Sequence, residues 1–276
     1  MEVYYHMKNH PIGIFDSGLG GLTAVREIQQ IMPNEDIVYF GDTGRVPYGS
    51  KSRDAINKYA RQDARFLKKM GVKIIVAACG TVSSVAPDLS EELGLPYTGV
   101  VNPTCFTACQ RTKNGRIGVI GTSATINSHS YKRRIREKHP EFEVLEQHCQ
   151  LFVSFVENGL VDPDDELVQL MVRRYMAPFK ESGVDTIILG CTHFPLLAEA
   201  IGREMGDGVT LIDSGKETAI YVKKILAEAD LLREDERQGE ANYYVSDTPA
   251  DFEKFAGLFL QNSPHNRVEH INIEEY

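Results

Sequence analysis

Short runs of β-branched and other apolar residues alternate with longer stretches of helical spacing along most of the chain. Two of these runs, 73–78 and 185–190, are too short for a helix and are predicted to be strands buried on both faces. In the stretch 22–32, by contrast, apolar residues recur every three or four positions, as they do on one face of a helix. Strands that alternate with helices in this way indicate an α/β fold with mainly parallel sheets.

The same pattern predicts the other elements, and it restarts after Asn102-Pro103, which we interpret as a break between two similar halves. Further strands are predicted at 11–15, 36–42, 95–101, 116–121, 142–145, 209–213, 242–246 and 268–273. Further helices are predicted at about 52–70, 83–93, 131–139, 164–182 with a kink near Pro178, 215–232 and 249–259. We expect the active site in the cleft between the halves, because ligands of parallel sheets bind beyond the carboxyl ends of the strands.

Polar and glycine-rich loops follow several of these strands. The loop Asp16-Ser-Gly-Leu-Gly-Gly21 is interpreted either as an anion cradle before a helix or as a tight turn capped by Asp16 or Ser17. It is not a dinucleotide fingerprint, because Thr23 stands where the third glycine belongs. The Pro47-Tyr48-Gly49 turn lies beyond the second strand, where Tyr48 and the Gly49 amide are placed to contact a ligand. Thr122 follows its strand as Asp16 follows the first one.

Two cysteines occupy matching positions, one in each half. Cys79 and Cys191 each follow a buried strand, and Thr81 and Thr192 lie within two residues of them. A single cysteine in such a place is more often a small core residue, but two in matching contexts favour function. Two thiols that face each other across one carbon can remove a proton from one side and return it on the other, which inverts the centre. A thiol is mostly un-ionised at neutral pH, so it needs a cationic neighbour, a helix N-terminus or a base to favour the thiolate. His193 serves this purpose for Cys191, and Asp16 for Cys79.

Composition narrows the function classes. The 276 residues are 42% apolar and 25% charged, which is typical of a folded protein. A net charge of −9 argues against nucleic acid or an anionic membrane as the main partner. Five cysteines without framework spacing indicate free thiols in a reducing compartment, and Cys105 and Cys109 lack partners for a zinc site. We expect a cytoplasmic protein with a disordered leader at residues 1–10, in which Met7 is an alternative start.

Motifs that occur in order along nearly the whole chain resemble those of glutamate racemases, in the aspartate/glutamate racemase family. They are Phe15-Asp-Ser-Gly-Leu-Gly-Gly-Leu22, Tyr39-Phe-Gly-Asp42, Pro47-Tyr-Gly49, Ala78-Cys-x-Thr81, Gly121-Thr122, Phe152-Val-Ser-Phe-Val-Glu157, Leu189-Gly-Cys-Thr-His-Phe-Pro195, Ile212-Asp213 and Val268-Glu-His-Ile271. The resemblance implies a bacterial, cofactor-independent isomerase that makes D-glutamate for peptidoglycan. It also implies two α/β domains, 1–102 plus 213–276 and 103–212, with the C-terminal segment packing back on the first.

The resemblance assigns roles to individual residues. It implies that Cys79 works on D-glutamate and Cys191 on L-glutamate, with Asp16 and His193 as assisting groups. The positions that resemble substrate-holding ones are Asp16, Ser17, Pro47, Tyr48, Gly49, Gly80, Thr81, Thr122, Glu157, Thr192 and His193. The resemblance further implies that the enzyme uses no metal or cofactor and forms a homodimer.

Two positions depart from the family pattern, and two other functions compete. Gly80 stands where the family commonly has asparagine, so a side-chain amide is missing, and Gln150 replaces a usual proline.

One competing function is a two-cysteine racemase for aspartate or another acidic amino acid. The other is a catalytically silent binding module, which is disfavoured because a binder has no need of two thiols. Glu157 also has an alternative interpretation as a surface residue of a short helix.

Overall fold

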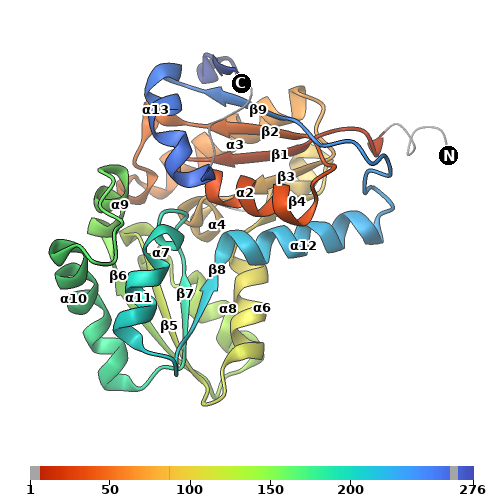
Figure 1. Ribbon diagram of the computed structural model, residues 1–276. Coiled ribbons are helices and arrows are strands. Elements are labelled where there is room, and N and C mark those ends of the chain that lie inside the picture. Colours follow the sequence, from red (N-terminus) through yellow and green to blue (C-terminus); the bar gives the residue numbers. More distant parts are fainter. Residues whose placement is uncertain (1–6, 87, 262–266) are drawn as a thin grey trace.

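The computed structural model describes residues 7–86, 88–261 and 267–276, and in them the strands form two separate parallel sheets (Figure 1). The first sheet has the order β10-β9-β2-β1-β3-β4, and the second has the order β6-β5-β7-β8. The strands of the first sheet are β1 (Ile12–Asp16), β2 (Ile37–Gly41), β3 (Ile74–Ala77), β4 (Tyr97–Gly99), β9 (Ala241–Val245) and β10 (Val268–His270). Those of the second are β5 (Arg116–Gly121), β6 (Glu143–His148), β7 (Thr186–Leu189) and β8 (Thr210–Asp213). The α/β class with parallel sheets is therefore confirmed.

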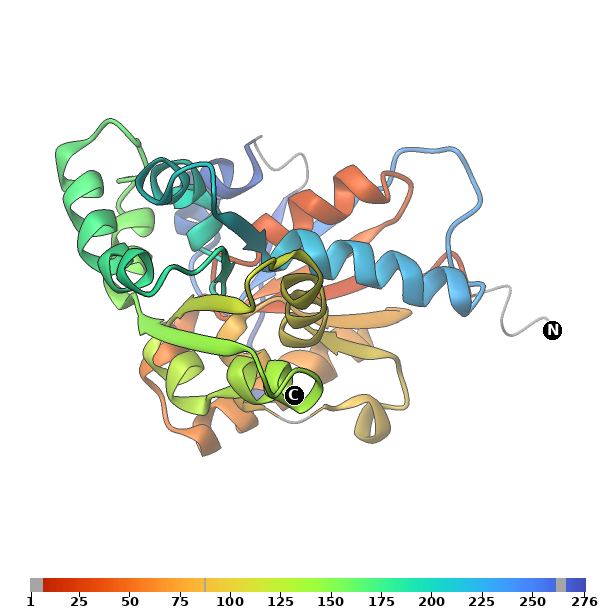
Figure 2. The same cartoon turned by 90° about the horizontal axis from the view of Figure 1, so that it is seen from below.

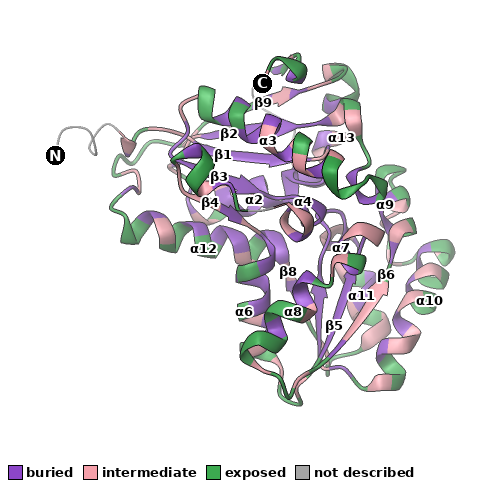
Figure 3. Cartoon of the chain, turned by 180° about the vertical axis from the view of Figure 1, so that it is seen from behind, coloured by how far each residue is buried: buried purple, intermediate pink, exposed green. Residues whose placement is uncertain are grey.

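Helices connect the strands and cover both faces of each sheet. They are α2 (Leu22–Ile31), α3 (Arg53–Lys69), α4 (Gly80–Val85), α5 (Ser90–Leu93), α6 (Val101–Arg111), α7 (Ser123–Ser128), α8 (Ser130–Lys138), α9 (Gln150–Glu157), α10 (Glu166–Ser182), α11 (Ala198–Met205), α12 (Ser214–Glu228) and α13 (Pro249–Leu260). Short 3-10 turns are η1 (Thr43–Arg45), η2 (Tyr48–Ser50), η3 (Phe194–Leu197) and η4 (Ile273–Glu275). Exposed residues lie mainly on the outer faces of these helices, and the central strands are buried (Figure 3).

Strand alternation decides which face each apolar side chain enters. Ile14 of β1 packs in the cluster that contains helix α2, whereas its neighbour Phe15 packs in the cluster that contains helix α3. The same alternation sends Ile74 and Ile75 of β3 to opposite faces. Successive side chains of a strand point to opposite faces, so a strand covered on both sides has to be apolar throughout.

The two sheets repeat one topology. Strands β2-β1-β3-β4 of the first sheet follow the same order as β6-β5-β7-β8 of the second. In β3 the last residue, Ala77, pairs with Phe15 of β1, and in β7 the last residue, Leu189, lies in register between β5 and β8. Cys79 and Cys191 each follow two residues after these strand ends. The repeat expected from the restart of the pattern therefore places the two thiols at equivalent positions.

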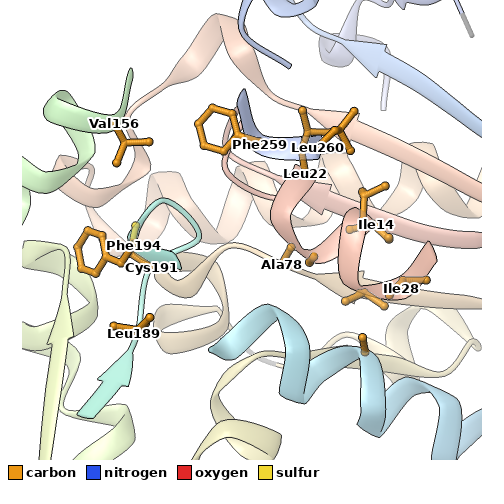
Figure 4. Packing of buried hydrophobic residues seen from close by; sticks show 14 of the residues in the cluster. Ile14, Leu22, Ile28, Ala78, Val156, Leu189, Cys191, Phe194, Phe259 and Leu260 are labelled. Carbon is orange, nitrogen blue, oxygen red and sulfur yellow. The ribbon is translucent and has the colours of Figure 1, made fainter. Parts of the chain in front are cut away.

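One hydrophobic cluster runs through both sheets. It contains Ile14 and Leu22 from the first half together with Leu189, Cys191 and Phe194 from the second, as Figure 4 shows. Helix α12 leads from β8 back to the first half, where it packs against α2 (Figure 2). The two halves are thus held together by apolar packing close to the second cysteine.

Four local expectations differ from the structure. The helix predicted over 83–93 is two short helices, because Ala86 precedes a proline and adopts an extended conformation. The break predicted at Asn102-Pro103 is wrong: both lie in the first turn of α6, where proline is tolerated because its missing N–H has no helical partner. The sequence also predicts that Thr122 caps the basic helix at 131–139, but it caps α7 instead, which precedes that helix.

The fourth difference concerns the leader. Lys8 is buried and bonded to Asp230 and Glu234, so residues 7–10 are packed rather than disordered. The part of that expectation that concerns residues 1–6 lies outside the described residues.

Candidate active site

The loops after β3 and β7 meet at one small cavity of about 30 Å³, which both cysteines line. Both thiol residues are buried, with 5% of Cys79 and 7% of Cys191 exposed. The lining consists of Ser17, Gly18, Val46, Pro47, Tyr48, Gly49, Cys79, Gly80, Thr81, Thr122, Gln150, Val153, Glu157, Cys191, Thr192 and His193. All the predicted site residues except Asp16 are brought together here.

Four lining residues were not among the predicted site residues. Gly18 belongs to the glycine-rich loop, and Val46 immediately precedes Pro47, so proximity to a motif is the signal that would have found them. Gln150 and Val153 lie on α9, and Gln150 accepts a hydrogen bond from the Ser123 amide. Their spacing of three residues does not indicate a binding site, because it is equally typical of the helix face that packs into the hydrophobic core.

The Cys79 thiol lies in an environment that keeps its proton. Burial and the nearby Asp16 carboxylate raise the pKa of the Cys79 thiol to about 12, although the Val82 amide and the Ser17 hydroxyl oppose the rise. The thiol donates to Ser17 Oγ at 3.7 Å. Cys79 is therefore protonated in this structure and can act as an acid.

Cys191 lies beside an imidazole that is itself held by a carboxylate. His193 Nδ1 is 3.8 Å from Cys191 Sγ and 3.5 Å from Thr192 Oγ1, and its Nε2 is 3.1 Å from Glu157 Oε1. Burial lowers the pKa of His193, but its contacts with Cys191 and Glu157 outweigh burial and raise that pKa to about 10. The imidazole is therefore placed to hold a proton that the Cys191 thiol releases. Glu157 lies half-exposed at the end of α9, so it is partly at the surface, as the alternative interpretation had it. It is also the last member of the series of contacts from Cys191 through His193.

Asp16 lies behind the cavity rather than in its lining. It is fully buried at the end of β1, and its Oδ2 accepts the Gly18 amide at 3.0 Å. Burial raises the pKa of Asp16, while the charge of His193 and the amides of the glycine loop lower it. The carboxylate therefore acts on the cavity through its charge and through the loop that it orders. The N-cap expectation differs too, because α2 begins after Gly21 without a side-chain cap.

The Pro47-Tyr48-Gly49 turn forms part of the cavity wall, but the Tyr48 hydroxyl is engaged elsewhere. It bonds to the carboxyl groups of Asp42 and Asp63, both of which are fully buried. The ring of Tyr48 packs against Tyr59 with a centroid separation of 5.3 Å. The turn therefore offers a ligand its backbone and the Gly49 amide rather than a phenol group.

Contacts across the cavity join the two halves. Thr81 Oγ1 and Thr122 Oγ1 are 3.0 Å apart, and Thr23 Oγ1 donates to the Thr192 carbonyl at 3.2 Å. A Cβ atom on Gly49 would lie 2.9 Å from Thr122 Cβ, so the absence of a side chain there permits this approach.

Comparison with known proteins identifies the family. A model of the family described as Asp/Glu/Hydantoin racemase matches residues 22–221. The chain belongs to this family. A curated relative from Geobacter metallireducens, named glutamate racemase, is 46% identical over 90% of this chain and 92% of its own length. The resemblance to glutamate racemases that the motifs predicted is thereby confirmed.

Solved structures of the family agree with the fold. The glutamate racemase of Francisella tularensis, crystallised with D-glutamate, is similar with a TM-score of 0.89 and 39% identity, covering 98% of this chain and all of its own. The aspartate racemase of Picrophilus torridus shares only 18% identity with a TM-score of 0.54, over 80% of this chain and 98% of its own, so it shows the shared fold alone. Within the described residues, the helices are too short or too polar to cross a bilayer.

Proposed function

We propose that this protein is a glutamate racemase that interconverts L- and D-glutamate without a cofactor, by proton transfer between Cys79 and Cys191. The observation that carries the two-thiol mechanism is that both sulfur-bearing residues line a single cavity, one from each half of the chain. The family match and the glutamate racemases that are similar over nearly the whole chain support the reaction and its substrate.

The two thiol environments suit opposite tasks. In the L-to-D direction, the Cys191 thiol first gives its proton to His193, and the thiolate takes the proton from the α-carbon of L-glutamate. The electron pair left on that carbon then takes the Cys79 thiol proton from the opposite face, which leaves a thiolate at Cys79. The high pKa of Cys79 supports its role as the acid in this direction. The reverse reaction exchanges the two roles.

The polar groups around the cavity suit an amino acid with two carboxylates. Hydroxyl groups are supplied by Ser17, Thr81, Thr122 and Thr192, and amide N–H groups by the Gly49 turn and the start of α4. Hydroxyls and amides bind carboxylates without adding a fixed charge. We propose these residues, with Pro47 and Gly80, as the substrate contacts, while Asp16, Glu157 and His193 support the thiols.

Substrate entry requires the two halves to separate. A cavity of about 30 Å³ holds about two water molecules and is smaller than any amino acid. We therefore propose opening between a first domain, 1–102 plus 213–276, and a second, 103–212. We also propose that the enzyme is cytoplasmic, supplies D-glutamate for peptidoglycan and acts as a homodimer.

A circular-dichroism assay of purified enzyme without added pyridoxal phosphate tests the proposal. Both enantiomers of glutamate are expected to racemise, and solvent deuterium is expected to enter at the α-carbon. Racemisation of aspartate alone would move the assignment to the competing racemase, and activity on neither amino acid would favour the binding module.

A further inference from the structure

A buried polar cluster lies directly behind the Pro47-Tyr48-Gly49 turn, outside the cavity. Its central members are Asp42, Asp63 and Arg45. Arg45 Nε donates to Asp42 Oδ2 at 2.6 Å, and a terminal nitrogen of the same guanidinium donates to Asp63 Oδ1 at 3.2 Å. The two carboxyl groups are fully buried, and the Arg45 side chain is 13% exposed. Two buried carboxyl groups therefore share one partly exposed cation.

The hydrogen bonds in this cluster need one hydrogen more than a tyrosine hydroxyl and two ionised carboxylates supply. The Tyr48 hydroxyl contacts Asp42 Oδ2 and is also 3.1 Å from Asp63 Oδ2. A hydroxyl has one hydrogen, so it satisfies one of two ionised carboxylates and turns a lone pair toward the other. An O–H on Asp63 removes this conflict, because Asp63 then donates to Tyr48 Oη while Tyr48 donates to Asp42.

The remaining contacts decide which of the two acids carries the proton. Asp42 accepts on every side: its Oδ2 takes the Arg45 and Tyr48 hydrogens, and its Oδ1 takes the Ser246 hydroxyl hydrogen at 2.7 Å. The Ser246 hydroxyl is the donor in this contact, and its oxygen also accepts the Gly44 amide. Asp42 therefore has no place for a proton, whereas Asp63 has one acceptor contact and one free position facing Tyr48 Oη.

We propose that Asp63 is held as a neutral carboxylic acid, and that the chain from Asp63 through Tyr48 to the Asp42–Arg45 ion pair positions the turn that contacts the substrate. Asp63 is a positioning residue here, because it reaches the cavity only through Tyr48. The kinetic test of this inference rests on the proposed function, whereas the test by thermal unfolding does not.

Electrostatics agree with this assignment. Burial raises the pKa of Asp63 well above its ordinary value; the charges of Asp42 and Asp16 raise it further, and Arg45 opposes them. The other charged group that faces the cluster is Glu274 of η4, whose carboxylate is 3.3 Å from Arg45 and half-exposed. The C-terminal turn thus covers the outer side of the cluster.

The decisive experiment compares Asp63→Asn with Asp42→Asn. An asparagine at 63 accepts from Arg45 and donates to Tyr48 as the neutral acid does, so KM and kcat for glutamate are expected to stay within about twofold of wild type. An asparagine at 42 turns an N–H toward another donor, which leaves one buried polar group without a hydrogen-bond partner. Because such a loss weakens binding about tenfold or more, KM is expected to rise by that factor. Asp63→Leu, which neither donates nor accepts, is expected to raise KM similarly with a smaller change in kcat.

A second measurement does not depend on turnover. Because a raised pKa makes the ionised form costly, wild type is expected to lose thermal stability as the pH rises toward the pKa of Asp63. Asp63→Asn does not titrate, so its unfolding midpoint is expected to fall less over the same range. Arg61→Gln, in an exposed ion pair on the same helix, serves as the control and is expected to change neither readout.

The outcomes separate the alternatives. If Asp63→Asn is as damaging as Asp63→Leu, or Asp42→Asn is tolerated while Asp63→Asn is not, the proton assignment is overturned. If wild type fails to racemise glutamate, the proposed function fails, and the unfolding comparison still decides the state of Asp63.

Discussion

A Cβ atom on Gly80 would lie 2.2 Å from the carbonyl oxygen of Gly190. Gly80 follows the first cysteine at the start of α4, and Gly190 precedes the second cysteine at the end of β7. Any side chain at position 80 would therefore collide with backbone across the cavity. Gly80, which the sequence analysis singled out, is thus one of the positions at which the two halves approach most closely.

This contact predicts that Gly80→Ala holds the two halves apart. The new methyl group cannot be accommodated in the closed form, so the substrate-free variant is expected to be more expanded and about 1–3 kcal/mol less stable than wild type. Small-angle scattering and thermal unfolding measure the two effects. Gly202→Ala, a change on α11 where only a distant side-chain atom is met, provides the control. Identical scattering and stability for Gly80→Ala and wild type would contradict the closure described above.

Replacing either active-site thiol is expected to stop turnover in both directions. Cys79→Ser and Cys191→Ser each substitute a hydroxyl, which is a much weaker acid than a thiol and hardly ionises near neutral pH. The kcat is therefore expected to fall by roughly 10²–10⁴-fold with either enantiomer of glutamate. Cys109→Ser, on α6 outside the cavity, is the matched control and is expected to retain full activity. Full activity in either active-site variant would remove that cysteine from the mechanism.

The alkaline limit of the D-to-L reaction, in which Cys191 and His193 supply the proton that the α-carbon receives, is expected to depend on Glu157. The contacts of His193 with Cys191 and Glu157 raise its pKa to about 10, so the proton on the imidazole is retained through neutral pH and lost as the pH rises toward that value. Glu157→Gln removes one of these contacts and is expected to move the alkaline decline in rate about one unit lower. The Glu157 side chain is 46% exposed, so a larger movement is not expected.

A matched pair provides the control for this pH profile. Glu146 of β6 is 2.6 Å from His129, which lies between α7 and α8, and both residues lie outside the cavity lining. Glu146→Gln is therefore expected to leave the profile unchanged. The same shift in both variants would indicate a general charge effect rather than the His193 contact.

The stability linked to His193 has a defined sign. Since its pKa is higher in the folded protein than the ordinary value of 6.5, protonated His193 contributes stability fully below that value, and the contribution is lost as the pH rises toward about 10. The unfolding midpoint of wild type relative to His193→Asn is therefore expected to decrease across this interval. A difference that does not vary with pH would contradict the raised pKa.

A stability prediction concerns Lys73, which is fully buried before β3. Its ammonium donates to Glu35 at 2.5 Å and to the Lys8 and Leu231 carbonyls, so it joins three separate segments. Lys73→Met leaves the Glu35 carboxylate buried without its cation and is expected to cost about 3–5 kcal/mol in chemical unfolding. The exposed Arg61–Glu92 pair is the contrast, because Arg61→Gln is expected to cost less than about 1 kcal/mol. Equal costs would contradict the burial of the Lys73 pair.

Much of this architecture could be predicted because buried parallel strands have an unmistakable composition. The runs before Cys79 and Cys191 are apolar on both faces, and such strands place whatever follows them at the ligand-binding edge of a sheet. The two cysteines, the threonines beside them and His193 could therefore be found without coordinates. Local errors arose where a general rule had an exception, as with Pro103 in the first turn of α6.

The sequence by itself determined the strand–helix alternation, the repeat of its two halves and the motifs of the racemase family, since these depend on residues close together in the chain. Only the tertiary structure decided that Asp16 lies behind the cavity, that the Tyr48 hydroxyl turns away from it, and that Gly80 meets Gly190. It also brought Asp63 of α3 to Asp42 after β2, a pair joined through the Tyr48 hydroxyl that no local pattern indicates. The physical reason is that burial and side-chain direction depend on how distant elements pack, and these decide which buried groups must share a hydrogen.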